Sequence, residues 1–439
     1  MAMITMIKKR DGRQVPFNIE KIANAIFKAA QTVGGKDYSE AMELADKVCQ
    51  QLSEEVIGRD PSVEEVQDMV ERVLVEQGHA KTAKAYILYR ADRTRAREMN
   101  STLMKIYEDL TFMSASDCDI KRENANIDGD TAMGTMLKYG SEGAKQFNEM
   151  YVLDPKHSQA HINGDIHIHD LDFLTLTTTC CQIDLLKLFH GGFPPGHGSL
   201  REPNDISSYA ALACIAIQSN QNDQHGGQSV PIFDYAMAEG VKKTFRRLYT
   251  TNLAKAVSFT LGIEDYTEVL EEFKLIAGDI AKEYGLYPSL QNNDEYKAKE
   301  WEIASAKYGD EFSHLQDRAE KLAESETDRA TYQAMEALIH NLNTMNSRAG
   351  AQNPFSSINY GTDTSPEGRM VIKNVMLAEE HGLGNGETPI FPIHIFKVKE
   401  GVNYNPGDPN YDLFKLAIRV SAKRMFCLLY TSPSPRDRG

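Results

Sequence analysis

The sequence has few cysteines and no long apolar runs. Only six of its 439 residues are cysteine and no two of them form a CxxC motif, so the disulfide framework of a small secreted protein is not expected. No stretch approaches the ~18 consecutive apolar residues of a membrane-spanning helix, and the first residues contain no signal-peptide core. These absences predict a cytoplasmic protein that does not bind membranes.

Basic side chains are outnumbered as well. The chain has 48 Lys and Arg against 63 Asp and Glu, which gives a formal net charge of −15 at pH 7. Such a charge disfavours non-specific binding to nucleic acid, which is therefore not expected as a partner. At ~150 residues per domain, the length predicts two or three globular domains.

Residues 1–97 are predicted to form one domain, made of a β-hairpin followed by four helices. The hairpin is expected within residues 3–17, with a charged turn at residues 9–13. The helices are expected to begin at Asn18, at Ser39, at Ser62 (with Glu65 as a capping box) and at about Lys81, the last one ending near Met99.

Positive charge is concentrated in this first domain. Between Lys81 and Arg97 six residues are basic and only Asp92 is acidic. Further basic residues in or beside the hairpin are Lys8, Lys9, Arg10, Arg13 and Lys21. Basic groups on a turn beside a helix start suit a polyphosphate, because fixed donors and the helix dipole both favour anions. A solvated helix face is the alternative interpretation.

Residues 98–426 are predicted to mix helices and strands, and residues 427–439 do not continue any pattern. Strands are expected at 165–172, 174–182 and 389–397, a Gly/Pro loop at 191–198, and helices at 205–218, over most of 235–340 and at 411–425. The highly charged stretch 295–329 is expected to be solvated surface. We interpret residues 427–439 as a non-native tail, with a native disordered tail as the alternative.

Two short segments contain side chains that could bind a metal or take part in catalysis. On a strand, His167, His169 and Asp165 would share one face, and such a set could hold zinc or iron, although this signal is weak and a hydrogen-bonded structural cluster is the favoured interpretation. The adjacent Cys180 and Cys181 would point to opposite faces, so one sulfur could line an interior while the other packs, or both could be structural.

Two polar loops could contact a nucleotide, and both could equally be plain loops. His225–Ser229 offers backbone amides next to two glycines, a possible phosphate cradle, but lacks the Gly-Lys-Ser/Thr ending of a P-loop. Ser347–Ser357 is similarly rich in polar side chains.

Several of these segments, in their order along the chain, resemble a known enzyme family. Residues 7–17 with Lys21, and residues 85–90, resemble the ATP-cone, an allosteric nucleotide-binding domain of ribonucleotide reductases. The segments 123–130, 164–173, 180–185 and 403–424 resemble the anaerobic (class III, glycyl-radical) ribonucleoside-triphosphate reductases. The resemblance covers about residues 3–426.

The resemblance implies an α/β fold in which the ATP-cone precedes a ten-stranded α/β barrel, present here only in its N-terminal part. It implies reduction of ribonucleoside triphosphates to 2′-deoxyribonucleoside triphosphates, with ATP and dATP as allosteric effectors. A glycyl radical installed by an S-adenosylmethionine activase, a structural zinc, and formate or a thiol system as reductant are implied for the family. A homodimer or an effector-dependent higher oligomer is implied as well.

The same resemblance assigns site residues. Cys180 matches the barrel cysteine that helps to reduce the 2′ position, and Cys181 is its alternative; Thr179 stands where related sequences often have Asn. The triphosphate contacts and turn of the cone match Lys9, Arg10, Asp11, Gly12 and Lys21, whereas His225–Ser229 and Ser347–Ser357 are expected to line nucleotide pockets.

The thiyl-forming cysteine, the radical glycine and the zinc-binding cysteines of the family match no residue before Phe426. We therefore expect this chain to bind ATP or dATP without turning over. Two other functions remain open: a metal-dependent hydrolase using His167, His169 and Asp170, and a nucleotide-sensing regulator, although the zinc ribbon of the latter is absent.

Overall fold

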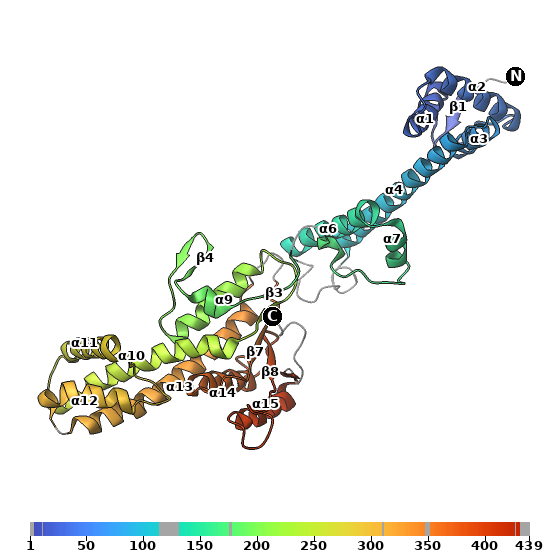
Figure 1. Cartoon of the computed structure of the whole chain (residues 1–439). Coiled ribbons are helices and arrows are strands. Elements are labelled where there is room, and N and C mark those ends of the chain that lie inside the picture. The colour runs from blue at the N-terminus through green and yellow to red at the C-terminus, as the bar shows by residue number, and fades with distance from the viewer. Residues whose placement is uncertain are drawn as a thin grey trace. The chain divides into compact units, whose positions relative to one another are not determined.

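The computed structural model describes residues 4–10, 12–113, 131–174, 178–309, 311–346, 352–425 and 427–430. Contacts divide the chain into two units, the first comprising residues 1–112 and 142–168 and the second residues 113–141 and 169–439. Figure 1 labels the elements of both units. No helix in the described part of the chain is long and apolar enough to cross a membrane.

The first unit begins with the predicted hairpin and four helices. Strands β1 and β2 pair antiparallel, with Ile7 opposite Val15. Their helices enclose one apolar core, in which Ile26, Val48 and Val73 are almost fully buried. The bounds are β1 Met6–Lys8, β2 Gln14–Pro16, α1 Ile19–Thr32, α2 Tyr38–Glu55, α3 Val63–Glu76 and α4 Ala80–Phe112.

Capping residues explain where these helices start. Asn18 accepts a hydrogen bond from the Glu20 amide, and Ser62 with Glu65 forms the predicted capping box at α3. The second helix starts earlier than predicted, because Asp37 and not Ser39 is its cap. The fourth helix extends to Phe112, well beyond the predicted end. The first unit is completed by part of α6 (Ala132–Phe147), the π-helical turn η1 (Asn148–Val152) and α7 (Pro155–Ile162).

The second unit contains a parallel five-stranded sheet in the order β3-β6-β7-β8-β9. Parallel strands linked by helices confirm the predicted α/β class. The bounds are β3 Cys181–Gln182, β6 Gln228–Val230, β7 Ser356–Tyr360, β8 Ile393–Lys397 and β9 Cys427–Tyr430. Strand β9 lies at the start of the segment that we interpreted as a tail.

Two local predictions in this unit are wrong. Residues 165–172 form no strand: Asp170 has a positive φ of 50°, which an extended strand does not allow, and the short 3-10 turn η2 (Leu171–Phe173) follows it. The predicted loop 191–198 instead contains β4 (Phe193–Gly196), which pairs antiparallel with β5 (Gly198–Leu200).

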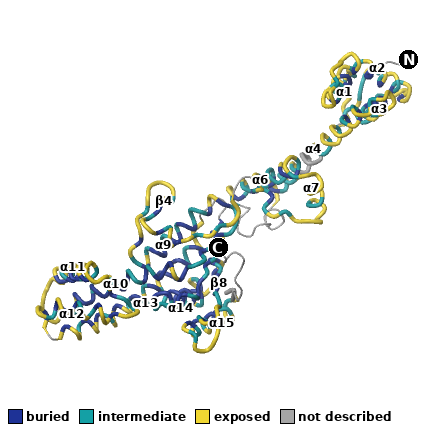
Figure 2. Tube along the Cα trace, viewed as in Figure 1, coloured by how far each residue is buried: buried dark blue, intermediate teal, exposed yellow. Residues whose placement is uncertain are grey.

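Long helices bury one face of the sheet. In β7 the alternate residues Ser356, Ile358 and Tyr360 are buried, and they belong to the face that packs on the helices. Figure 2 shows the buried residues concentrated along α10, α13 and α14. The helix bounds are α8 Leu185–Phe189, α9 Ile206–Asn220, α10 Phe233–Leu261, α13 Phe312–Thr344, α14 Pro366–His381 and α15 Tyr411–Arg424.

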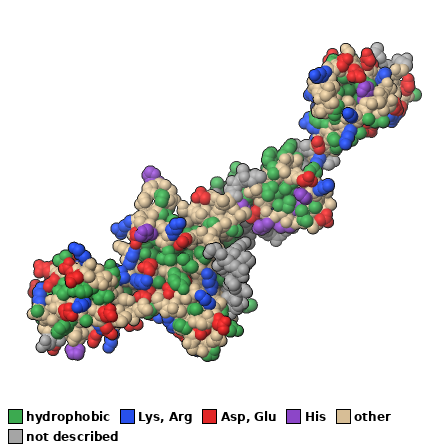
Figure 3. All heavy atoms as spheres, in the orientation of Figure 1, with side chains coloured by type: hydrophobic (Ala, Val, Ile, Leu, Met, Phe, Trp, Pro, Cys, Tyr) green, Lys and Arg blue, Asp and Glu red, His purple; other side chains and the backbone are tan. Residues whose placement is uncertain are grey.

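A second apolar core contradicts the interpretation of residues 295–329 as solvated surface. Here α11 (Tyr266–Tyr284) and α12 (Asp294–Tyr308) pack on the ends of α10 and α13 around Phe273 and Phe312. Figure 3 shows acidic and basic side chains interspersed over the outer faces of α11 and α12. The charged residues therefore cover one face of an amphipathic layer whose other face is buried.

This layer contains a buried carboxyl group. Tyr249 Oη and Gln316 Nε2 donate hydrogen bonds of 2.7 and 2.8 Å to Glu300 Oε2, and Tyr296 Oη donates one of 3.2 Å to Oε1. Burial raises the pKa of Glu300 to about 7, although these three donors oppose the rise.

The raised pKa of Glu300 predicts a pH-dependent stability. Between its ordinary value and about 7 the folded chain keeps a proton that the unfolded chain has lost, so stability falls as the pH rises. The variant Glu300→Gln lacks this loss, and its free energy of unfolding should improve relative to wild type by about 3 kcal/mol between pH 5 and pH 8. Urea unfolding at both pH values measures the difference, and an equal difference at the two would contradict the prediction.

Candidate functional site

The hairpin of the first unit presents the predicted phosphate contacts on a tight turn. Gly12 has a φ of +83° and its amide donates to the Lys9 carbonyl at 3.0 Å, a conformation that favours glycine. Arg10 forms an ion pair with Glu64 and donates to Gln67 Oε1 at 3.1 Å. Asp11 lies outside the described residues. Lys9 is thus on the same turn as Arg10, whose guanidinium is already held by α3.

The other basic residues of this unit are more scattered than the sequence indicated. Lys21 is exposed in the first turn of α1, directly after the hairpin. Arg90 lies 2.5 Å from Asp68 and 2.8 Å from Glu71, so part of the positive charge of α4 is balanced by α3. Lys9 and Lys21 are therefore the predicted contacts for which no acidic partner is described.

The two neighbouring cysteines have different surroundings. Cys180 is exposed, just before β3. Cys181 lies on β3, and its sulfur accepts a 3.0 Å hydrogen bond from Asn220 Nδ2 of α9. Burial raises the pKa of the Cys181 thiol, partly offset by that hydrogen bond. Cys180 is thus the more exposed residue of the pair and Cys181 the more buried one.

Backbone amides of the His225–Ser229 loop form hydrogen bonds to carbonyls of neighbouring segments. The amides of His225 and Gly226 donate to Thr178 and Thr179 carbonyls at 3.2 and 2.8 Å, and the Gln228 amide donates to Phe355. These amides are not available to a phosphate, so the structure favours the plain-loop interpretation. Of the loop Ser347–Ser357, residues 347–351 lie outside the described part.

The metal hypothesis has no geometric support. With no strand at 165–172, His167 and His169 do not share a strand face, and the His169 side chain is 84% exposed. Nowhere among the described residues are three His, Cys, Asp or Glu side chains placed to hold a metal ion. The hydrolase alternative therefore lacks the site it needs in that part of the chain.

A basic cavity of about 570 Å³ lies between α10, α11 and the segment that precedes α9. Its cationic lining residues are Lys243, Arg246, Arg247 and Lys274, against the single acid Glu202. Thr250 and Thr251 add hydroxyl groups from the next turn of α10. A cavity of this size with converging cations suits a phosphorylated ligand.

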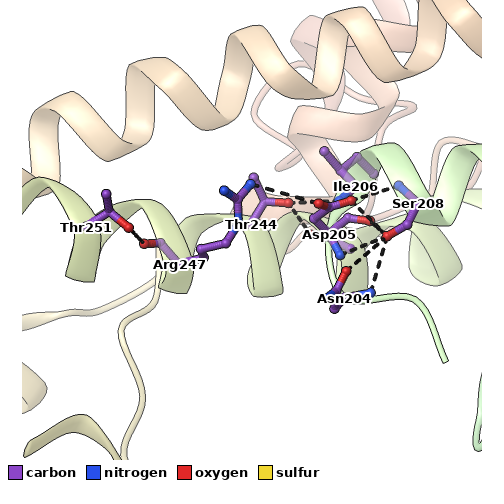
Figure 4. A network of polar contacts seen from close by, with 8 residues as sticks. Asn204, Asp205, Ile206, Ser208, Thr244, Arg247 and Thr251 are labelled. Carbon is purple, nitrogen blue, oxygen red and sulfur yellow. Dashed lines mark hydrogen bonds and ion pairs between the residues drawn. The ribbon is translucent and has the colours of Figure 1, made fainter. Parts of the chain in front are cut away.

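Polar contacts hold the wall of this cavity in place, as Figure 4 shows. Asp205 caps α9 by accepting from the Ser208 amide at 2.8 Å, and the Ile206 amide donates to Thr244 Oγ1 of α10, also at 2.8 Å. Arg247 Nη2 reaches within 4.0 Å of Asp205 Oδ2. Although burial opposes its charge, the contacts with Ser208 and Arg247 keep the pKa of Asp205 below its ordinary value.

The cationic side chains of the cavity differ in the protein contacts that they already make. Lys243 Nζ lies 2.6 Å from Glu202, and this contact outweighs the effect of burial and raises the pKa of Lys243. Arg246 stacks over the Tyr287 ring at 4.2 Å, and its buried Nε has no hydrogen-bond partner among the described residues. Arg246 is therefore held by an aromatic contact, and one of its donors is unsatisfied in the described part of the chain.

Sequence reasoning missed this cavity. Its α10 residues Lys243, Arg246 and Arg247 occupy positions i, i+3 and i+4, so a helical periodicity of basic residues was visible. Glu202 and Lys274 come from other elements, and only the packing of α9, α10 and α11 brings them together.

Comparison with known proteins identifies two regions. Residues 123–436 match the family model of anaerobic ribonucleoside-triphosphate reductase, and residues 5–95 match that of the ATP cone domain. The anaerobic ribonucleoside-triphosphate reductases of Salmonella typhimurium and Escherichia coli are each 28% identical, over 97% of this chain and 51% of their own length. The chain thus spans about half the length of these curated relatives.

A solved structure of the anaerobic ribonucleotide reductase from Thermotoga maritima in complex with dATP and CTP is also similar. It is 14% identical with a TM-score of 0.43, and the match covers 78% of this chain and 50% of that one.

Proposed function

Because the chain belongs to the anaerobic ribonucleoside-triphosphate reductase family, we propose that it serves the reduction of ribonucleoside triphosphates to 2′-deoxyribonucleoside triphosphates under the control of nucleotide effectors, and that its 439 residues alone bind these effectors without turning over. The observation that carries the proposal is the family match over residues 123–436, together with the cone match that precedes it. The substrate is a ribonucleoside triphosphate and the compartment is the cytoplasm.

Cys180 is the proposed catalytic residue of this chain. Cys180 is an exposed residue, whereas the sulfur of the neighbouring Cys181 accepts a hydrogen bond from Asn220 of α9. In the reaction the 2′ hydroxyl leaves as water, and a thiol is oxidised as the 2′ carbon gains hydrogen. Cys180 would supply a hydrogen atom to that step, and formate or a dithiol protein would restore the reduced state.

For the whole protein we also propose the radical and zinc components that the family uses. In the family a glycyl radical, installed by an S-adenosylmethionine activase, starts the chemistry, and four cysteines bind a structural zinc. The cysteines whose side chains are described are Cys49, Cys180, Cys181 and Cys214, and no metal-binding group is found among the described residues. None of the described residues is therefore assigned to the radical or to the zinc. An effector-dependent dimer or larger oligomer completes the proposal.

Two effector sites are proposed. In the cone, Lys9, Arg10, Gly12 and Lys21, with Asp11, would bind the triphosphate of ATP or dATP. The basic cavity lined by Arg246 and Arg247 would bind a second nucleotide, since its lining includes two further cations, Lys243 and Lys274, and the single acid Glu202. Cations that converge on one cavity favour a polyphosphate over a neutral ligand.

Anaerobic conversion of radiolabelled CTP tests the proposed reaction. The chain extended to the length of its relatives, with activase, S-adenosylmethionine and reductant, should form dCTP, and the conversion should respond to ATP and dATP. Hydrolysis of CTP without dCTP, or activity that ignores both effectors, would contradict the proposal.

A further inference from the structure

Cys180 lies directly against the loop formed by His225 and Gly226. The His225 amide donates to the Thr178 carbonyl and the Gly226 amide to the Thr179 carbonyl. The loop is therefore hydrogen-bonded to the two residues before the cysteine. A Cβ on Gly226 would lie 2.7 Å from Cys180 Sγ and 2.7 Å from the Thr179 carbonyl oxygen. The backbone of this loop is therefore the wall against which the sulfur rests.

The His225 side chain anchors that wall. It is only 3% exposed, and its ring stacks on Phe173 with centroids 4.7 Å apart and planes 8° from parallel. Its Nε2 lies 3.5 Å from Asp170 Oδ2. Asp170 and Phe173 border the turn η2, which precedes Cys180 in the chain, so one imidazole links this turn to the loop behind the sulfur.

The position of Asp170 also has a conformational requirement. Its φ of 50° is uncommon for a residue other than glycine, and Asp is one of the few side chains that tolerate it. A carboxylate in that conformation points at His225 and at His169 Nε2, which lies 3.4 Å away. The left-handed backbone thus serves to aim the carboxylate at the buried imidazole.

We propose that His225, held by Asp170 and Phe173, is a positioning residue that fixes the Gly226 wall and thereby the orientation of the Cys180 thiol. The inference rests on the proposed function only in that Cys180 is the reacting thiol. Hydrogen transfer to a substrate carbon requires a sulfur held in one place, and an exposed cysteine between loops has no such restraint of its own. His225 supplies this restraint through the Gly226 backbone, which contacts Thr179 and Cys180.

Alkylation of Cys180 in the 439-residue chain tests this positioning role. The chain is first reduced and then treated with iodoacetamide, and the rate of alkylation at each cysteine is measured by tandem mass spectrometry. We expect His225→Ala to change the rate at Cys180 by roughly tenfold, the equivalent of about 1.4 kcal/mol. His225→Gln, whose side-chain amide can reach toward the Asp170 carboxylate as the imidazole Nε2 does, should stay within about twofold of wild type.

Buried Cys214 is the internal control, because it is labelled only when the second unit opens. Wild-type rates at Cys180 in His225→Ala, or a parallel rise at Cys214, would overturn the proposal. So would a failure of His225→Gln to restore the rate. The assay needs no turnover, so failure to make dCTP would refute the proposed function and leave this result standing.

Discussion

Replacing Cys180 with alanine should lower deoxynucleotide formation by at least about 1000-fold in the protein at the length of its relatives, because the variant cannot supply the reducing hydrogen. Binding of CTP and of effectors should be unchanged, since Cys180 is an exposed residue and its loss should leave the fold intact. Initial rates of dCTP formation and calorimetric titrations measure the two effects separately. An active Cys180→Ala protein would contradict the assignment.

Cys181→Ala is the matched control. This variant loses the hydrogen bond from Asn220, and a loss of about 1 kcal/mol of stability is expected from that bond. Its turnover should stay within about threefold of wild type, since the Cys181 sulfur is packed toward α9. If Cys181→Ala abolishes dCTP formation and Cys180→Ala does not, the roles of the two cysteines are exchanged.

Variants in the two proposed nucleotide sites should each weaken the binding of dATP at one site. Lys9→Ala should weaken binding to the cone, and the double variant Arg246→Ala/Arg247→Ala should weaken binding to the basic cavity. A charge-assisted hydrogen bond is worth about 1.5–3 kcal/mol, so each loss should be about 10- to 100-fold in Kd. Isothermal titration resolves the two because each variant leaves the other site intact.

Lys242→Ala separates local binding from general charge. Lys242 neighbours Lys243 on α10, but it pairs with Glu239 and does not line the cavity. It removes one positive charge from the same helix, yet dATP affinity should change by less than about twofold. Equal losses in Lys242→Ala and in the double arginine variant would refute a site at the cavity.

The parts of the fold that depend on neighbours in sequence were predictable. The capping box of Ser62 and Glu65 and the cap at Asn18 are local hydrogen-bond motifs, and both helices start where these residues indicated. The second helix shows the limit of such reasoning. Asp37 and Ser39 are both good caps, and only the folded backbone decides between them.

Two of the failed predictions depend on tertiary contacts. Alternating side chains at 165–172 resemble a strand, but Asp170 adopts a left-handed conformation stabilised by its partners His169 and His225. The charged stretch 295–329 looked solvated because its burial partners come from α10 and α11. Cone residues were predicted by resemblance to a family, whereas the basic cavity required the packing of three separate elements.

Titration of the 439-residue chain with dATP tests the central claim most directly, namely that this chain is the effector-binding part of a nucleotide reductase. We predict two binding events per chain, one lost in Lys9→Ala and the other in Arg246→Ala/Arg247→Ala. Absence of any dATP binding, or binding that neither variant weakens, would contradict it.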